Sequence, residues 1–117
     1  MNPEDLKKRT KEYALRVIRL VESLPADQVS RILGNQLLRA DTSVGANYRA
    51  ATRARSRADF IAELGIVEEE WDASLYWMEL LVEARRIRPG RLSALMTEGD
   101  EIVAITVASI KTAPSRV

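Results

Sequence analysis

Residues 60–82 read FIAELGIVEEEWDASLYWMELLV, and this stretch decides the fold. Its apolar side chains recur at steps of three and four, which is the spacing of one face of an α-helix. This stripe consists of Phe60, Leu64, Val67, Trp71, Leu75, Met78 and Val82. A stripe of this length predicts a helix of nearly 30 residues, or about 45 Å, that packs against other helices.

Three further amphipathic segments accompany this helix, and prolines mark where the segments begin and end. The prolines lie at four predicted boundaries, namely Pro3, Pro25, Pro89 and Pro114. The sequence contains no alternating β-rich run beside an Asn-Gly or Asp-Gly turn. We therefore expect four helices, at about residues 3–24, 26–54, 57–87 and 91–112. Because short connections make consecutive helices antiparallel, the sequence predicts one all-α domain over residues 1–117, an antiparallel up-and-down four-helix bundle.

The composition argues against an enzyme. The 117 residues include no Cys and no His, and 18 Lys and Arg nearly balance 17 Asp and Glu. Disulfides, Cys/His zinc sites, Ser-His or Cys-His catalysis and Glu-x-x-His di-iron sites are therefore excluded. Glu79 and Glu83 are one helical turn apart, but no second carboxylate pair faces them. We expect no catalytic residues, no metal and no other cofactor.

The sequence shows no sign of export or membrane insertion. Its N-terminus mixes both charges and has no apolar segment behind it. The longest apolar stretch, residues 102–108, is far shorter than the roughly 20 residues that a membrane span needs. We expect a cytoplasmic protein that makes no contact with a membrane.

Four glycines fall inside the predicted helices, where each costs about 1 kcal/mol relative to Ala. Gly34, Gly45 and Gly65 are either tolerated in well-packed helices or mark the close approach of another helix, and the sequence favours neither alternative. Gly99 is a candidate for a bend or a break in the last helix.

A line of polar side chains lies on the core side of the helix expected at residues 26–54. At about 100° per residue, Gln36, Ser43 and Asn47 project between Val29 and Ala40. Buried polar groups need hydrogen bonds, so we expect these three residues to bond to a neighbouring helix and fix its register. A ligand site is the less favoured alternative, because no nucleophile, base or metal-binding set accompanies them.

The helix expected at residues 57–87 carries more apolar residues than one buried face needs. A second set is rotated about 140° from the first, and its candidate contact residues are Ile66, Ala73, Tyr76, Trp77 and Leu80. Exposed apolar stripes mark protein–protein contacts, in which Trp and Tyr are frequent anchors. We predict a subunit interface at these residues. The alternative is extra burial under the first or last helix of the same chain.

The near-zero net charge is a cancellation between two helices. Residues 39–57 hold five arginines and one acid, whereas residues 59–83 hold eight acids and no base. Three interpretations remain open. The two faces are solvated, or they pair between subunits and set register and partner choice, or the arginines contact phosphates and ring assembly multiplies their surface. The candidate phosphate-binding residues are Arg31, Arg39, Arg49, Arg53, Arg55 and Arg57.

Three segments carry a resemblance to a known family. Residues 39–51 read RADTSVGANYRAA, residues 56–60 read SRADF, and residues 70–81 read EWDASLYWMELL. They resemble the 23S rRNA intervening-sequence proteins, whose second helix carries Ser-Ile/Val-x-x-Asn and whose third helix begins with Ser-x-x-Glu/Asp-Phe. Many relatives have Glu-Gly shortly after the Asn, where this chain has Ala50 and Ala51. The role of that Glu does not transfer to this chain.

The resemblance implies an up-and-down bundle that assembles into a ring-like homopentamer. The related accessory variability determinant of diversity-generating retroelements forms a basic pentamer that binds nucleic acid and a reverse transcriptase. The implied partners are therefore further copies of this chain, RNA or DNA, and a protein such as a reverse transcriptase. The best functional hypothesis is non-catalytic binding of RNA or another nucleic acid through the arginines of the second helix. The alternative is an assembly or adaptor protein whose Arg and acidic faces pair between subunits.

Overall fold

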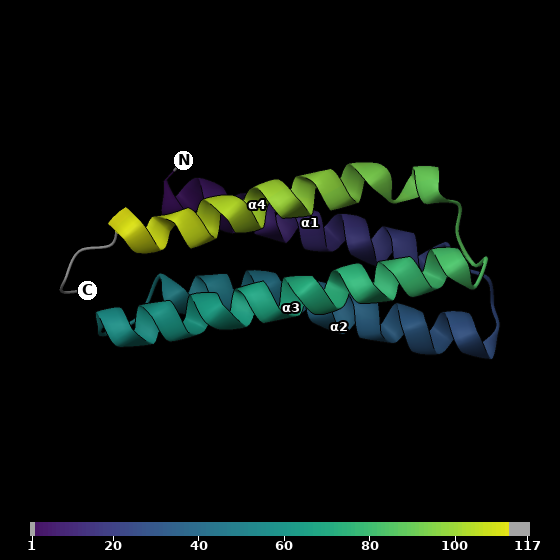
Figure 1. Cartoon of the computed structure of the whole chain (residues 1–117), viewed down its shortest axis with the longest axis horizontal. Coiled ribbons are helices and arrows are strands. Elements are labelled where there is room, and N and C mark those ends of the chain that lie inside the picture. Colours follow the sequence, from purple (N-terminus) through teal and green to yellow (C-terminus); the bar gives the residue numbers. More distant parts are fainter. Residues whose placement is uncertain (1, 113–117) are drawn as a thin grey trace.

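The computed structural model describes residues 2–112, and these residues form an elongated bundle of 48 × 22 × 19 Å. Its helices are α1 (Pro3–Glu22), α2 (Gln28–Ala51), α3 (Arg57–Glu83) and α4 (Ser93–Thr112), with a short 3-10 turn, η1 (Pro89–Arg91), before α4. Consecutive helices run in opposite directions along the long axis (Figure 1). This confirms the predicted all-α four-helix bundle. Pro114, expected to end the last helix, lies outside the described residues.

Side chains at the helix N-termini fix where three of the helices begin. The side chains of Asn2, Asp27 and Ser56 accept hydrogen bonds from backbone N–H groups three residues later, at 2.9, 2.9 and 3.0 Å. Each of these bonds satisfies a donor that has no partner within its own helix. The capping pattern at Ser56 therefore positions α3 and the apolar stripe that follows it.

The end of α3 lies four residues before the expected one, at Glu83. Arg85 adopts a left-handed backbone conformation with φ of 59°, and its N–H donates to the carbonyl of Val82 at 2.9 Å. The N–H of Arg86 donates to the carbonyl of Leu81, also at 2.9 Å. This pair of bonds is the Schellman arrangement, which usually has glycine at the left-handed position. The chain turns here toward η1 and α4.

The core follows the stripe that residues 60–82 predict. Leu64, Val67, Trp71 and Met78 are buried, and they pack with buried side chains of the other three helices. The buried partners include Val17 and Leu20 of α1, Leu37 and Val44 of α2, and Leu95 and Ile102 of α4. Burial of this much apolar surface is the main force that holds the helices together.

Gly99 lies where α4 packs closely against Trp71 of α3, and α4 continues through it without a break. A Cβ atom at Gly99 would lie 2.8 Å from Cζ2 of the Trp71 indole ring and closer still to two other ring atoms. The indole N–H of Trp71 donates to Asp100 Oδ1 at 2.9 Å. Gly34 also allows a close approach, since a Cβ there would lie 3.0 Å from Leu24, whereas no such neighbour lies within 4 Å at Gly65.

Candidate nucleic-acid interface

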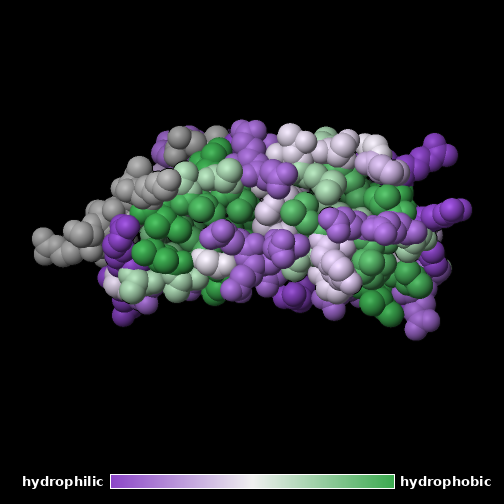
Figure 2. Space-filling view, in the orientation of Figure 1, coloured by the Kyte–Doolittle hydropathy of each residue, from purple (hydrophilic) through white to green (hydrophobic). Residues whose placement is uncertain are grey.

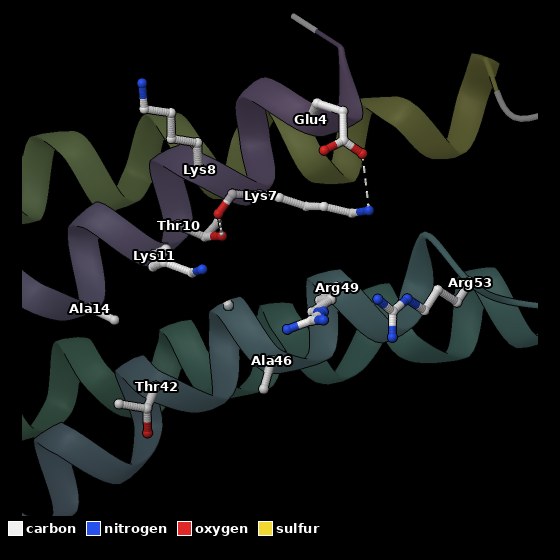
Figure 3. A pocket seen from close by; sticks show the side chains of 11 residues that line it. Glu4, Lys7, Lys8, Thr10, Lys11, Ala14, Thr42, Ala46, Arg49 and Arg53 are labelled. Atoms are coloured by element: carbon white, nitrogen blue, oxygen red, sulfur yellow. Dashed lines mark hydrogen bonds and ion pairs between the residues drawn. The ribbon is translucent and has the colours of Figure 1, made fainter.

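A groove of about 560 Å³ runs between the first half of α1 and the second half of α2. Its lining includes five cations, Lys7, Lys8, Lys11, Arg49 and Arg53, and one acid, Glu4. The side chains of Lys7, Lys11, Arg49 and Arg53 extend into the space between the two helices, whereas Lys8 points away from it (Figure 3). The first half of α1 and the end of α2, with the turn that follows it, thus direct four positive charges into one open groove.

Helix periodicity and small residues shape this groove. Lys7 and Lys11 are one turn apart on α1, so they lie on the same face. Arg49 is in the last turn of α2, where the negative end of the helix dipole favours a cation. Arg53 follows in the turn after α2, and its N–H donates to the carbonyl of Ala50 at 3.0 Å. The remaining lining residues are short: Thr10, Ala14, Thr42, Gly45 and Ala46.

The groove keeps a net positive charge, because among the described residues that line it five are cations and one is an acid. Lys7 Nζ lies 3.1 Å from Glu4 Oε1, but the Glu4 side chain is 82% exposed. Such a surface ion pair contributes little to stability. Arg9 belongs to the same basic run of α1 but lies on its other side. Its guanidinium makes two 2.8 Å hydrogen bonds to Glu98 and a 2.9 Å ion pair to Glu101 on α4.

Of the six arginines predicted to contact phosphates, the structure brings Arg49 and Arg53 together in the groove. Arg31 is exposed near the start of α2, and Arg55 is exposed in the connection to α3. Arg39 Nη1 lies 3.6 Å from Glu70 Oε1 of the same chain. Arg57 Nη2 donates to the carbonyl of Ile110 at 3.1 Å, so it joins the start of α3 to α4.

The lysines of α1 line the groove, but no sequence pattern predicted them as binding residues. They stand in a visible basic run, Lys7, Lys8, Arg9 and Lys11. Which of these four meets α2 and which meets α4 depends on the rotation of α1 against both neighbours. That rotation is a property of the tertiary packing, so no local pattern contains it.

A sequence model of the 23S rRNA-intervening sequence proteins matches residues 4–108. The chain belongs to this family. The match spans α1, α2, α3 and most of α4, and it confirms the resemblance inferred from the three segments quoted above. The whole groove between α1 and α2 lies within it.

A crystal structure of a protein of unknown function from the S23 ribosomal protein family of Bacteroides thetaiotaomicron has the same fold. That protein is 34% identical to this chain, with a TM-score of 0.87. The comparison covers 95% of this chain and 99% of the other. No curated protein matches the sequence. Among residues 2–112, no helix is long and apolar enough to cross a membrane, and no three acidic side chains gather as a metal would need.

Of the three polar side chains of α2 that we expected to bond to a neighbouring helix, Asn47 bonds within its own helix. Gln36, Ser43 and Asn47 are half-buried. The amide nitrogen of Asn47 donates to the carbonyl of Ser43 in its own helix at 2.8 Å. The most deeply buried polar side chain of α2 is instead Asp41, which is 1% exposed.

Asp41 lies in the interior beside Ser74 and Glu70 of α3. Its carboxyl oxygens have no hydrogen-bond partner among the described residues, and the same holds for the Ser74 hydroxyl and for Oε2 of Glu70. Burial raises the pKa of the Asp41 carboxyl from 3.8 to about 7; the nearby Ser74 hydroxyl opposes this shift, and the charge of Glu70 adds to it. No sequence pattern marks this residue as buried, because a single acid in an Arg-rich segment resembles a surface charge.

The second apolar face of α3 is partly exposed. Ile66 and Tyr76 are 38% and 54% exposed, while Ala73, Trp77 and Leu80 are half-buried. Trp77 packs against the core and makes an edge-to-face contact with Tyr76, with 5.2 Å between ring centroids. Its buried indole N–H has no partner within residues 2–112. Apolar surface is also visible on the face that α3 and α4 present in Figure 2, in two areas separated by polar side chains.

Proposed function

We propose that this chain is a non-catalytic, cytoplasmic RNA-binding protein that holds RNA in the groove between α1 and α2. The observation that carries the proposal is the convergence of Lys7, Lys11, Arg49 and Arg53 on one groove with a single acid in its lining. Phosphate contacts from Lys and Arg supply most of the affinity of proteins for nucleic acids. The resemblance described above implies RNA or DNA as a partner, and we take RNA as the ligand of this proposal.

The groove supports binding but offers no chemistry. Its side chains are Lys, Arg, Glu, Thr and Ala, and a general acid–base or nucleophilic mechanism needs a paired nucleophile and base. The Thr10 and Thr42 hydroxyls donate to carbonyls of their own helices, at 3.0 Å to Lys7 and 2.8 Å to Leu38. Among the described residues, both hydroxyls are thus engaged by backbone carbonyls, which leaves the groove suited to holding a ligand.

The test is RNA binding by fluorescence anisotropy, with a variant that reverses the charge of the groove. Arg49→Glu combined with Arg53→Glu should weaken RNA binding by at least about tenfold and make it less sensitive to salt. The matched control, Arg31→Glu combined with Arg88→Glu, makes the same change of net charge at exposed positions outside the groove. Equal affinity of the two double variants for RNA would overturn the proposal.

We also propose that the chain assembles as a homo-oligomer, with a pentamer favoured, through the α3 face formed by Ile66, Ala73, Tyr76, Trp77 and Leu80. The exposure of Ile66 and Tyr76 supports this face, since exposed aromatic and aliphatic side chains are typical interface anchors. The second candidate function, an assembly or adaptor protein without RNA binding, rests on the same exposed side chains. RNA affinity that is unaffected by reversing the charge of the groove would favour it.

A further inference from the structure

We infer that the chain has a second anion site, separate from the groove, which binds a diphosphate or a longer phosphate chain. The site is a hollow of about 270 Å³ between the end of α1 and the start of α4, and we call it the arginine hollow. Its lining consists of Arg16, Arg19, Leu20, Arg91 and Leu95. None of these residues lines the groove between α1 and α2, so the inference goes beyond the proposed RNA binding.

The rotation of α1 separates the two sites. Arg16 follows Lys7 by nine positions, which at about 100° per residue places the two side chains on opposite sides of the helix. Lys7 extends into the space between α1 and α2 (Figure 3). Arg16 lies on the side of α4, since Leu95 of α4 lines the same hollow. A small ligand in the groove therefore does not contact the arginine hollow.

The three arginines of the hollow come from two segments, and a hydrogen bond orients one of them. Arg16 and Arg19 are one turn apart on α1, so they lie on the same side of that helix. Arg91 belongs to η1, and its Nη2 donates to Ser23 Oγ at 3.0 Å. Ser23 Oγ in turn donates to the carbonyl of Leu20 at 2.6 Å. The Arg91 side chain is thus held beside α1 before a ligand binds, which lowers the entropic cost of binding.

The arginines of the hollow form no ion pair with a carboxylate among residues 2–112. Glu98 of α4 is the acid that interacts with Arg16 over a longer distance. A hydrogen bond from Arg9 and, to a smaller extent, the charge of Arg16 lower the pKa of the Glu98 carboxyl. Arg9 Nη2 donates to Glu98 Oε1 at 2.8 Å, so this carboxylate is already engaged. The positive charge of the hollow is therefore left for an external anion.

A set of three arginines favours a phosphate over a carboxylate. Each guanidinium is a planar fork of donors that pairs with two oxygens. A carboxylate has one negative charge and two oxygens, whereas a terminal phosphate carries more charge and three oxygens, so it engages more than one fork. The hollow is also smaller than the pockets of about 300–1,000 Å³ that enclose drug-sized ligands. It is suited to a phosphate group whose remaining atoms lie outside.

A neighbouring hollow favours more than one phosphate. Arg91 also lines this second hollow, which has a volume of about 480 Å³ and includes Arg85, Arg86 and Arg88. Arg86 pairs with Asp27 at 3.3 Å. Among the described residues, neither lining includes an acid. A second phosphate that extends past Arg91 therefore stays in positive surroundings, which favours pyrophosphate over inorganic phosphate.

The experiment is isothermal titration calorimetry of the full chain at low salt with inorganic phosphate, pyrophosphate and a nucleoside triphosphate. Pyrophosphate should bind at least about tenfold more tightly than phosphate, the effect of one further charge-assisted hydrogen bond. Equal affinity for pyrophosphate and the nucleoside triphosphate would show that the phosphates alone are recognised. An RNA with a 5′-triphosphate, compared with its 5′-hydroxyl form on Arg49→Glu combined with Arg53→Glu, tests whether an RNA end is a source of this group.

Single variants locate the site. Arg19→Gln and Arg91→Gln should each weaken pyrophosphate binding at least about tenfold through the loss of a charge-assisted hydrogen bond. The control Arg31→Gln removes the same charge at an exposed position outside both hollows, and it should leave the affinity unchanged. Far-UV CD checks that each variant is folded.

Two results would overturn the inference. One is pyrophosphate that binds no more tightly than phosphate, or equally well to Arg19→Gln and Arg31→Gln. The other is a chain that binds no pyrophosphate and whose sedimentation coefficient falls in Arg19→Gln, which would assign the arginines to a subunit contact. Neither result bears on the groove, because the proposed function is tested at Arg49 and Arg53.

Discussion

Asp41→Asn should stabilise the protein at neutral pH, and the gain should disappear in acid. The Asp41 carboxyl is 1% exposed and has no hydrogen-bond partner among residues 2–112. The groups that face it are Tyr13 of α1 and Glu70 and Ser74 of α3. None of them is a cation, so the ionised form has no compensating charge. Asn has nearly the same shape and is neutral at every pH.

The size of this stability gain follows from the pKa of the Asp41 carboxyl, which is about 7 in the folded chain against an ordinary 3.8. Below about pH 4 the carboxyl is protonated in both the folded and the unfolded chain, so it costs nothing. As the pH rises from about 4 to about 7, the unfolded chain releases this proton while the folded chain keeps it, and stability falls. Each pKa unit corresponds to about 1.4 kcal/mol, so the loss is of the order of 4 kcal/mol.

The assay is urea unfolding of both proteins between pH 4 and pH 8. The difference in unfolding free energy between Asp41→Asn and the parent should be small at pH 4, should grow to several kcal/mol at pH 7 and should then level off. Taking this difference cancels the groups whose pKa is lowered, such as Glu98 beside Arg9 and Asp27 at the start of α2. Asp72→Asn, at an exposed position of α3, is the control. A difference that stays constant from pH 4 to pH 8 would refute the reasoning.

Three further predictions concern packing, the end of α3 and the proposed subunit interface. Gly99→Ala should destabilise the protein by about 1–3 kcal/mol, because the added methyl group meets the Trp71 ring. Gly65→Ala has open space around it and should stabilise the protein by about 1 kcal/mol. Thermal unfolding checks both variants, and equal effects on stability would contradict the close packing at Gly99. Arg85→Gly should raise the unfolding free energy by about 1 kcal/mol, because glycine adopts a positive φ without cost; in urea unfolding, Arg85→Ala should show no such gain. Tyr76→Asp should shift the protein to a smaller species in sedimentation velocity, while its far-UV CD spectrum stays unchanged. Retention of the parental sedimentation coefficient would exclude Tyr76 from the proposed interface.

The helices and the core face of α3 could be predicted because they depend on the spacing of residues that are close together in the sequence. Leu64, Val67, Trp71 and Met78 recur at helical spacing, and Pro3, Pro25 and Pro89 stand at predicted boundaries. The end of α3 was harder, since Arg85 occupies a position at which the common signal would be glycine. The role of Gly99 depends on a ring from another helix, and no spacing within α4 reveals it.

The candidate site could be predicted only in part, because it lies between two helices. Arg49 and Arg53 stood out as part of the Arg-rich second helix, but the lysines opposite them depend on how α1 is rotated in the bundle. Arg39 and Arg57 belong to the same basic pattern, yet they contact Glu70 and the carbonyl of Ile110. Charge patterning thus identified the basic helix, and tertiary packing selected which of its arginines meet in the groove.

The measurement that tests the central claim most directly is the salt dependence of RNA affinity for the parent and for Arg49→Glu combined with Arg53→Glu. Between about 50 and 200 mM salt, the parent should lose affinity steeply, and the double variant should show a log–log slope shallower by about 1.4, for two lost phosphate contacts on a single strand. Parent and variant with the same affinity and the same slope would contradict the assignment of the groove as the RNA site.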